Sequence, residues 1–390
     1  MQHFDVIIVG AGVVGSATAY YLRKLGFAGS IGLIEKDTTY QLSCTARSAG
    51  GLRQQFSTPE NIELSKFGLR LIRNLKQEFG PEADVGFREQ GYLILASKEG
   101  LPILEENHRI QIDHGADNVL LKGGALAARF PWLVCDGLAG GCFGLSGEGW
   151  LDPYSLMHLF RKAALAKGAS VIAGEVTAIG QSGGRIASVA LASGETVSCS
   201  HLVNAAGAGA GALAKLAGIG LPVGPRKRYV YVIDCPAADE TLHRAPLTVE
   251  PGGVYFRPEG RHFICGLSPE ESEEPRTMDW EVDYSWFEER IWPVLAERVP
   301  QFEAIKVINA WVGHYDYNAL DQNGVIGRHP ELTNFYFANG YSGHGLQQGP
   351  ASGNAIAELI VHGGWRSIDL TRLGYERIAR GEPLFEKNVI

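Results

Sequence analysis

The chain has 390 residues, of which 45% are hydrophobic and 20% charged, and its net charge is −8. These values are typical of a folded globular protein with two or three domain-sized units. The net charge is negative and the sequence has no long basic run, so we do not expect nucleic acid or anionic membranes as main partners.

Six cysteines occur without CxxC or zinc-site spacing, so we expect reduced thiols, no metal site and a cytoplasmic location. The first apolar run begins at Phe4, close to the first residue, so we expect no signal peptide.

The first residues predict a βαβ unit. Residues 4–9 (FDVIIV) predict a strand buried on both faces, residues 13–25 a helix, and residues 31–35 (IGLIE) a second strand. Residues 6–22 carry no charge and resemble a membrane span in composition. Their glycine-rich turn fits a strand, turn and helix better, so we expect no integral membrane segment.

Further elements follow from capping signals and periodicity. Ser57 to Glu60 fits a capping box that opens a helix extending to about Phe79, and Asp152 is expected to cap another helix. The later predictions are hairpin strands at 171–179 and 186–197, a buried strand at 201–206, a helix near 286–297, a strand at 334–338 and a helix at 351–361.

A GxGxxG motif, Gly10 to Gly15, follows the first strand and opens the first helix. Gly10 permits the tight turn, Gly12 the approach of a pyrophosphate, and Gly15 close packing of helix on strand. Glu35 lies twenty residues after Gly15 and can accept hydrogen bonds from ribose hydroxyls. Because its charge would repel a 2′-phosphate, FAD or NAD is favoured over NADP.

Two other glycine runs point to FAD. Residues 204–209 (NAAGAG) end a strand, and residues 340–347 (GYSGHGLQ) connect a strand to a helix. The second run predicts another helix N-terminus, which can stabilise the N1–C2=O edge of a reduced flavin. FAD is long, so contacts from the middle and both ends of the chain favour FAD over NAD.

The chain resembles the D-amino-acid oxidase superfamily of FAD-dependent oxidoreductases, which includes glycine oxidase, sarcosine oxidase and dimethylglycine dehydrogenase. The resemblance covers nearly the whole length, and QQFSTPENIELS at 54–65 is most similar to FAD-dependent oxidoreductase domain-containing proteins. The other runs that carry it are GAGVVGSATAYYL with Glu35, GYLILA at 91–96, WLDPYSL at 150–156, NAAGAGA at 204–210, WVGHYDYNALDQNGVIGRHP at 311–330 and YFANGYSGHGLQQGP at 336–350.

The resemblance implies an α/β fold in which a Rossmann-type FAD-binding domain is interleaved with a substrate domain built on an antiparallel sheet. We expect residues 1–88, 149–221 and 318–390 in the FAD-binding domain, and residues 89–148 and 222–317 in the substrate domain.

The resemblance also implies noncovalent FAD. The flavin-linking cysteine of sarcosine oxidase matches Gly313, and the linking histidine of the related dehydrogenases matches Arg47. The cofactor contacts implied by the motifs and the resemblance are Gly10, Gly12, Val13, Val14, Gly15, Glu35, Lys36, Arg47, Ser48, Ala49, Gly50, Gly51, Leu52, Val176, Ala205, Ala206, Gly207, Gly313, Gly343, His344, Gly345, Leu346 and Gln347.

The ligands that bind the substrate carboxylate in these relatives match Phe56, Tyr315 and Gln347, none of which is charged. A simple amino-acid substrate is therefore in doubt. Tyr255 matches a tyrosine that lines the active site of both oxidases. His314 and His344 are pocket candidates, although His344 could equally be a turn residue bonded to backbone. Arg53 and Arg257 are expected on the solvated surface or against the flavin rather than on the substrate.

These features predict an enzyme that oxidises a C–H bond next to an amine by hydride transfer to flavin N5. Its substrate would be a small-molecule amine or N-substituted amino acid, and its electron acceptor O2 or another molecule. One alternative is a flavoprotein with a mainly non-catalytic assembly or binding role, and another is an NAD-dependent dehydrogenase.

Overall fold

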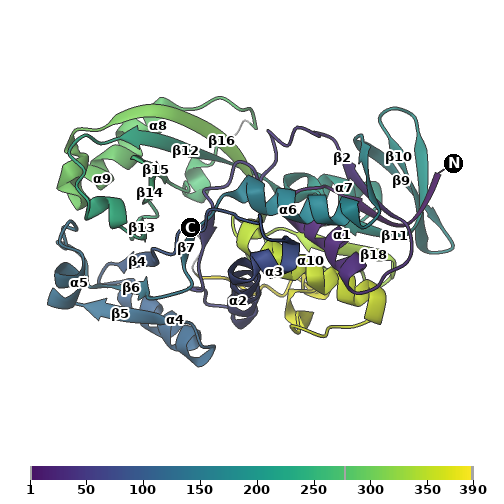
Figure 1. Ribbon diagram of the computed structural model, residues 1–390, viewed down its shortest axis with the longest axis horizontal. Helices are drawn as coiled ribbons and strands as arrows, with labels where there is room; N and C mark the ends of the chain where they lie inside the picture. Colours follow the sequence, from purple (N-terminus) through teal and green to yellow (C-terminus); the bar gives the residue numbers. More distant parts are fainter. Residues whose placement is uncertain (1, 276–277, 388–390) are drawn as a thin grey trace.

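The computed structural model describes residues 2–275 and 278–387, which form two eight-stranded sheets and a small two-stranded one. Figure 1 shows the two large sheets toward opposite ends of the molecule. Helices α1 (Val13–Lys24, purple) and α10 (Gly345–His362, yellow) lie side by side next to the first sheet. The predicted α/β fold class is confirmed.

The first sheet is built around β1, which pairs in parallel with β2 and with β11. Val6 and Ile8 enter the core beneath α1, whereas Ile7 and Val9 enter the core beneath α7 (Ala210–Leu216). The strand is therefore buried on both faces, as its apolar run predicts. In spatial order the strands are β17 (Val325–Arg328), β18 (Phe335–Asn339), β11 (Thr196–Asn204), β1 (Gln2–Val9), β2 (Ile31–Glu35) and β8 (Ala169–Ala173), with the hairpin of β9 (Val176–Ser182) and β10 (Arg185–Leu191) attached to β11.

The second sheet is antiparallel except for one parallel pair, β13 with β4. One of its faces packs into a core that contains Tyr231, Phe256 and Phe263. In spatial order the strands are β16 (Lys306–Asn318), β12 (Val223–Asp234), β15 (His262–Gly266), β14 (Tyr255–Glu259), β13 (Leu247–Val249), β4 (Tyr92–Ala96), β6 (Gly140–Gly144) and β5 (Asn118–Lys122). The small sheet pairs β3 (Gly51–Leu52) with β7 (Gly149–Trp150). The chain segments that connect strands of the second large sheet contain α4 (Leu101–Asp113), α5 (Gly124–Arg129), α8 (Tyr284–Trp286) and α9 (Trp292–Arg298).

Several local predictions need correction. The capping box is wrong, because the hydroxyl of Ser57 donates to Glu386 at 2.7 Å and Glu60 pairs with Arg372 at 3.0 Å. Both partners are far away in sequence, so no local pattern reveals them. The predicted helix is also two helices, α2 (Pro59–Arg73) and α3 (Leu75–Phe79).

Further predicted boundaries shift. The stretch 171–179 is two strands, β8 and β9, and the strand at 201–206 is the end of β11. Helix α10 begins at Gly345, ahead of the predicted residue 351. The cap at Asp152 is confirmed, because its carboxylate accepts from the Tyr154 N–H at 3.0 Å at the start of α6 (Pro153–Ala166).

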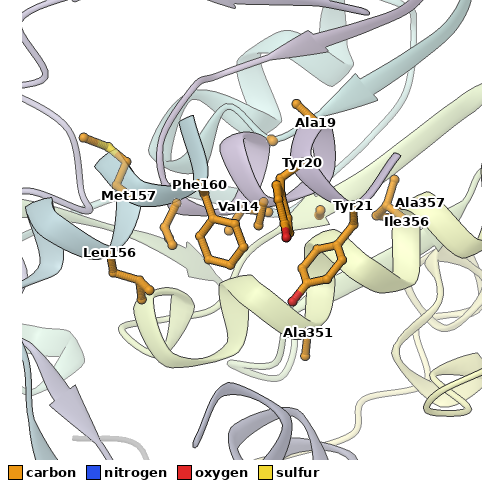
Figure 2. Close-up of a cluster of buried hydrophobic side chains, with 14 of the residues drawn as sticks. Val14, Ala19, Tyr20, Tyr21, Leu156, Met157, Phe160, Ala351, Ile356 and Ala357 are labelled. Carbon is orange, nitrogen blue, oxygen red and sulfur yellow. The ribbon is translucent and has the colours of Figure 1, made fainter. Parts of the chain in front are cut away.

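The core beside the first sheet joins α1, α6 and α10. Figure 2 shows Tyr20 and Tyr21 of α1 together with Phe160 of α6, close to α10. The Tyr20 and Phe160 ring centroids are 5.6 Å apart, an edge-to-face contact. On α10, Gly349 and Gly353 face α1 directly, because a Cβ at Gly353 would lie 2.6 Å from the Thr18 backbone nitrogen. Small residues therefore bring the two helices into close contact.

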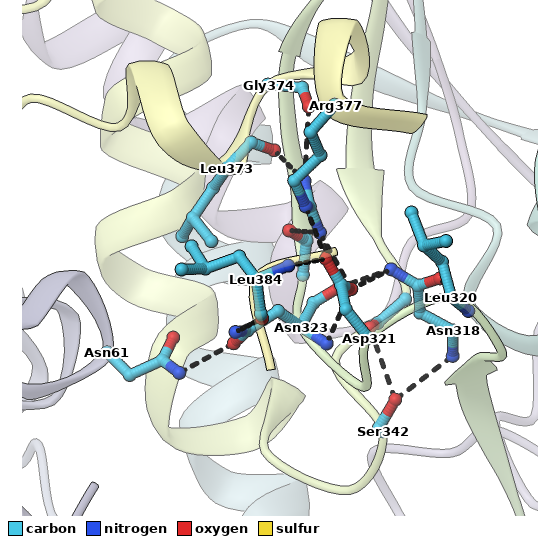
Figure 3. Close-up of polar contacts among 12 residues, drawn as sticks. Asn61, Asn318, Leu320, Asp321, Asn323, Ser342, Leu373, Gly374, Arg377 and Leu384 are labelled. Atoms are coloured by element: carbon cyan, nitrogen blue, oxygen red, sulfur yellow. Dashed lines mark hydrogen bonds and ion pairs between the residues drawn. The ribbon is translucent and has the colours of Figure 1, made fainter. Parts of the chain in front are cut away.

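A buried ion pair fixes the loop ahead of α10. Figure 3 shows Arg377 of α11 (Tyr375–Arg380) reaching Asp321, with its Nε 2.6 Å from Asp321 Oδ2. Asp321 Oδ1 accepts from Asn318 Nδ2 at 2.8 Å, and the Asn318 N–H donates to Ser342 Oγ at 3.0 Å. This chain of bonds connects the C-terminal helix to the turn that opens α10.

Arg377→Met should lower the free energy of unfolding by about 3–5 kcal/mol, because it leaves the Asp321 charge buried without its partner. Arg380→Met on the same helix is the matched control, since the Arg380–Glu382 pair is 67% and 66% exposed. That variant should change stability by about 0–1 kcal/mol. Denaturant titration of both proteins measures the difference, and equal effects would contradict the role of the Arg377–Asp321 pair.

Candidate cofactor and active site

A groove of about 560 Å³ runs across the carboxyl ends of β1 and β2 toward the N-terminus of α10. Its volume is in the range of small-molecule and cofactor sites. Residues from the beginning, middle and end of the chain line it: Gly10, Gly12, Val13, Val14, Glu35, Lys36, Asp37, Leu42, Ser43, Cys44, Thr45, Arg47, Ser48, Glu175, Ala205, Ala206, Gly207, Ala208, Gly209, Trp280, Gly313, His314, Tyr315, Asp316, Ala338, Tyr341, Gly343, Gly345 and Leu346.

The turn between β1 and α1 has the geometry that the GxGxxG motif predicts. Gly10 has φ +97°, and a Cβ there would overlap the Ala205 carbonyl oxygen. A Cβ at Gly15 would overlap the carbonyl oxygen of Gly10, so Gly15 packs beneath the turn instead of lining the groove. These close approaches bring the backbone of the turn up to the groove at the start of α1.

Glu35 ends β2 at the side of the same turn. Its Oε2 accepts from the Ala11 N–H at 2.8 Å, and its Oε1 accepts from the Asp37 N–H at 3.0 Å. These bonds hold the carboxylate in place at the groove wall. A fixed acceptor beside a glycine turn and a helix N-terminus fits the ribose and pyrophosphate of a dinucleotide.

The N-terminus of α10 forms the other end of the groove. Gly343 has φ +103°, and Gly343, Gly345 and Leu346 line the surface. His344 and Gln347 are not part of the groove lining, and both contact Arg53. Backbone atoms of this turn are therefore available to a ligand in the groove, and the side chains of His344 and Gln347 pack against Arg53.

Arg53 is the centre of that support. It is 1% exposed, so the expectation of a solvated surface position is wrong. Its Nη2 lies 3.0 Å from His344 Nε2, and its backbone N–H donates to Gln347 Oε1 at 2.7 Å. The fully buried Phe56 ring lies 4.1 Å from the guanidinium carbon. Burial, together with the Arg53 charge, lowers the pKa of His344 well below its ordinary value, so its imidazole is neutral.

His314 lies at the rim of the groove. Its ring centroid is 4.2 Å from that of Trp280, and its Nε2 is 3.2 Å from the Asp279 carbonyl oxygen. Burial lowers its pKa. Arg47 stacks over the same Trp280 ring and donates to the Val312 carbonyl at 2.8 Å. Trp280 is therefore part of the groove wall.

Neither of the positions that match a covalent flavin link carries a linking side chain. Gly313 and Arg47 both line the groove, and a Cβ at Gly313 would lie 3.6 Å from the Cβ of Arg47. The two positions that match the covalent attachment sites of the relatives therefore lie next to each other on the groove wall. Because neither carries a cysteine or a histidine, the structure agrees with noncovalent FAD.

Asp316 is a groove residue that sequence reasoning missed. Its Oδ2 accepts from the Gly340 N–H at 2.8 Å and the Tyr341 N–H at 3.2 Å, and burial raises its pKa to about 6. Residues 313–316 of β16 all line the groove, so the two-residue alternation of a strand does not single out Asp316. Cys44, Thr45 and Glu175 were also missed.

Other predicted contacts lie beside the groove or behind it. Among the described residues, Glu175 lines the groove where Val176 was expected. Ala49, Gly50, Gly51 and Leu52 lead from the groove into β3. Arg257, expected on the surface or against the flavin, is 5% exposed and donates from Nη2 to the Ala49 carbonyl at 2.8 Å. Tyr255 is buried in a cluster with Tyr92 and Trp150.

None of the helices in residues 2–275 and 278–387 is both long enough and apolar enough to cross a membrane.

Comparison with known proteins agrees with this geometry. The family model described as FAD dependent oxidoreductase matches residues 5–359. The FAD-dependent oxidoreductase domain-containing protein 1 of Xenopus laevis is 42% identical, and the match covers 100% of this chain and 85% of that protein. Human mitochondrial sarcosine dehydrogenase is 27% identical over 92% of this chain and 40% of its own length.

A solved structure is similar over almost the whole molecule. The L-proline dehydrogenase of P. horikoshii has a TM-score of 0.87 and 26% identity, and the match covers 98% of this chain and 100% of that one. The glycine turn, the fixed Glu35 carboxylate and the α10 N-terminus occur together in one groove. The chain therefore belongs to the family of FAD-dependent oxidoreductases, and FAD is its cofactor.

Proposed function

We propose that the chain oxidises a C–H bond next to the nitrogen of an amine or N-substituted amino acid. The observation that carries the proposal is the α10 N-terminus at the far end of the groove from Glu35, next to Tyr315. L-Proline dehydrogenase and sarcosine dehydrogenase, two similar proteins, are named for substrates of this kind. Bound FAD supplies the hydride acceptor, its N5 atom.

The residues of the chain contribute positioning and electrostatics. Backbone N–H groups at the first turn of α10, with the helix dipole, favour negative charge at the end of the groove beside Gly343. Tyr315 packs on this turn, because a Cβ at Gly343 would lie 2.7 Å from its ring. Arg53 holds the turn from behind through His344 and Gln347.

His344 has no role as a base in this proposal. Its Nε2 accepts from Arg53, and its imidazole is buried outside the groove lining. A substrate amine that binds in its neutral form needs no protein base at the hydride step. Reoxidation uses an electron acceptor, either O2 or another molecule.

In the relatives, charged residues bind the substrate carboxylate. The uncharged residues at the matching positions of this chain indicate which amines should react. Phe56 is buried beneath Arg53, and the Gln347 amide oxygen is occupied by the Arg53 N–H. Neither offers a charge to a small amino acid. Losing two charge-assisted hydrogen bonds corresponds to about 3–6 kcal/mol, or roughly two to four powers of ten in affinity.

Anaerobic mixing with a panel of amines tests this function through bleaching of the flavin absorbance. Bulky N-substituted amino acids should reduce the flavin, whereas glycine and sarcosine should do so poorly. Rapid reduction by sarcosine at sub-millimolar concentration would contradict the argument from Phe56 and Gln347. If no amine in the panel bleaches the flavin, the proposed oxidation is wrong and a non-catalytic role replaces it.

Glu35→Ala should weaken FAD binding by about 1.5–3 kcal/mol, because it removes a charged acceptor and leaves the Ala11 N–H without its partner. Titration of apoprotein with FAD measures the dissociation constant. Glu175→Ala is the matched control, since it removes the same charge from an exposed position on the groove. An unchanged dissociation constant in Glu35→Ala, or a loss no larger than in the control, would show that Glu35 does not contact the cofactor.

A further inference from the structure

Asp316 of β16 places a carboxyl group between the groove and the loop that precedes α10. Its Oδ2 accepts from the N–H groups of Gly340 and Tyr341, at 2.8 and 3.2 Å, and its carbonyl oxygen accepts from the Ser342 N–H at 3.1 Å. The bond between Asn318 and Ser342 in Figure 3 holds the same loop. The carboxyl group is therefore fixed relative to the N-terminus of α10.

The other oxygen of this carboxyl group, Oδ1, accepts no hydrogen bond from another residue within 2–275 and 278–387. Asp316 is 7% exposed and lines the groove, so Oδ1 is the oxygen that is available there. Gly343 and Gly345, at the N-terminus of α10, line the same groove. Asp316 thus shares one groove with the turn that favours negative charge on the reduced flavin.

The neighbouring titratable groups leave Asp316 as a proton-binding group near neutral pH. Burial raises the pKa of Asp316 to about 6, and the bonds from the Tyr341 and Gly340 N–H groups offset this only in part. The Cys44 thiol and the Tyr341 hydroxyl respond to the Asp316 charge. Burial, together with that charge, raises the pKa of both groups, so both are neutral near pH 7.

The basic groups of the adjacent elements are neutral or bonded to other carboxylates. Burial lowers the pKa of His314, two residues before Asp316, and of His344 at the start of α10. Three basic residues of β12, the strand that pairs with β16, form ion pairs: Arg226 with Glu271, Lys227 with Asp279 and Arg228 with Glu274, at 2.8, 2.6 and 2.7 Å. In the part of the chain that the structure describes, a negative Asp316 therefore has no adjacent counter-charge.

Reduction of the flavin adds a second negative charge to this groove. Hydride transfer converts neutral oxidised flavin to an anion, which the α10 N-terminus favours. Two like charges in one buried site repel each other, and the repulsion raises the proton affinity of the group that titrates near neutral pH. That group is Asp316, because its neighbours Cys44 and Tyr341 already carry their protons.

We propose that Asp316 binds a proton when the flavin is reduced, so that the protein takes up two protons with each pair of electrons near neutral pH. The substrate hydride, or two electrons from a chemical reductant with one proton from solvent, converts FAD to its anionic reduced form. Solvent supplies the second proton, which converts the Asp316 carboxylate to a neutral carboxylic acid. Reoxidation returns that proton to solvent. The inference depends on bound FAD and on no particular substrate.

Reduction potentials of the FAD-loaded protein, measured by equilibration with redox dyes between about pH 6 and pH 9, test the proposal. Each proton taken up with two electrons lowers the potential by about 30 mV per pH unit. The wild type should lose about 59 mV per pH unit just above pH 6, where oxidised Asp316 is ionised, and about 30 mV at the alkaline end. Asp316→Asn should lose about 30 mV throughout, although its amide oxygen can still accept from Gly340 and Tyr341.

Asp113→Asn, at an exposed position at the end of α4, is the matched control and should follow the wild type. A loss of about 30 mV per pH unit in the wild type over the whole range would overturn the proposal. The same steep loss in the wild type and in Asp316→Asn would also overturn it, because the second proton would then bind to the flavin or to another group.

Infrared difference spectra of reduced against oxidised wild-type protein, at about pH 7, give a second measurement that needs no variant. The carbonyl stretch of a protonated carboxylic acid should appear on reduction, shift when the protein contains isotope-labelled aspartate, and be missing in Asp316→Asn. FAD content and melting temperature show whether that variant is folded and loaded. If it is not, absence of the band in the wild type, or a band that labelled aspartate does not shift, would still overturn the proposal.

Discussion

The site depends on the close packing of two helices from opposite ends of the chain. Gly353 of α10 faces the backbone of α1 at Thr18, and a Cβ at Gly349 would lie 2.9 Å from a methyl carbon of Val13. This approach places the N-termini of both helices on one groove. The N-terminus of α1 then favours the phosphates of FAD, and the N-terminus of α10 favours the negative charge of the reduced flavin ring. A larger residue at Gly353 would separate these two ends.

The remaining contacts keep that arrangement rigid. The Arg377–Asp321 pair and the Asn318–Ser342 bond hold the turn ahead of α10, and Arg53 holds it from the opposite side. The second sheet closes the groove through β16, where Tyr315 packs on Gly343. Positioning by buried side chains behind a backbone-lined surface suits an enzyme whose cofactor performs the chemistry.

The sequence predicted those parts of the site whose causes are local. The Gly10–Gly15 turn, Glu35 and the α10 turn all follow from glycine spacing at strand ends, and each lines or supports the groove. Contacts between distant residues were not predictable. Phe56, His344 and Gln347, which the resemblance places around the substrate, all contact Arg53. His344 and the Phe56 ring lie against its guanidinium group, and Gln347 accepts from its backbone N–H.

Hydrogen–deuterium exchange of the apoprotein with and without FAD tests most directly whether three separated segments make one cofactor site. The account predicts slower exchange together at residues 11–15, 205–209 and 343–347, with no change in β5 at the far edge of the second sheet. Protection confined to residues 11–15, with residues 343–347 unaffected, would contradict the claim that the α10 N-terminus forms the other end of the FAD groove.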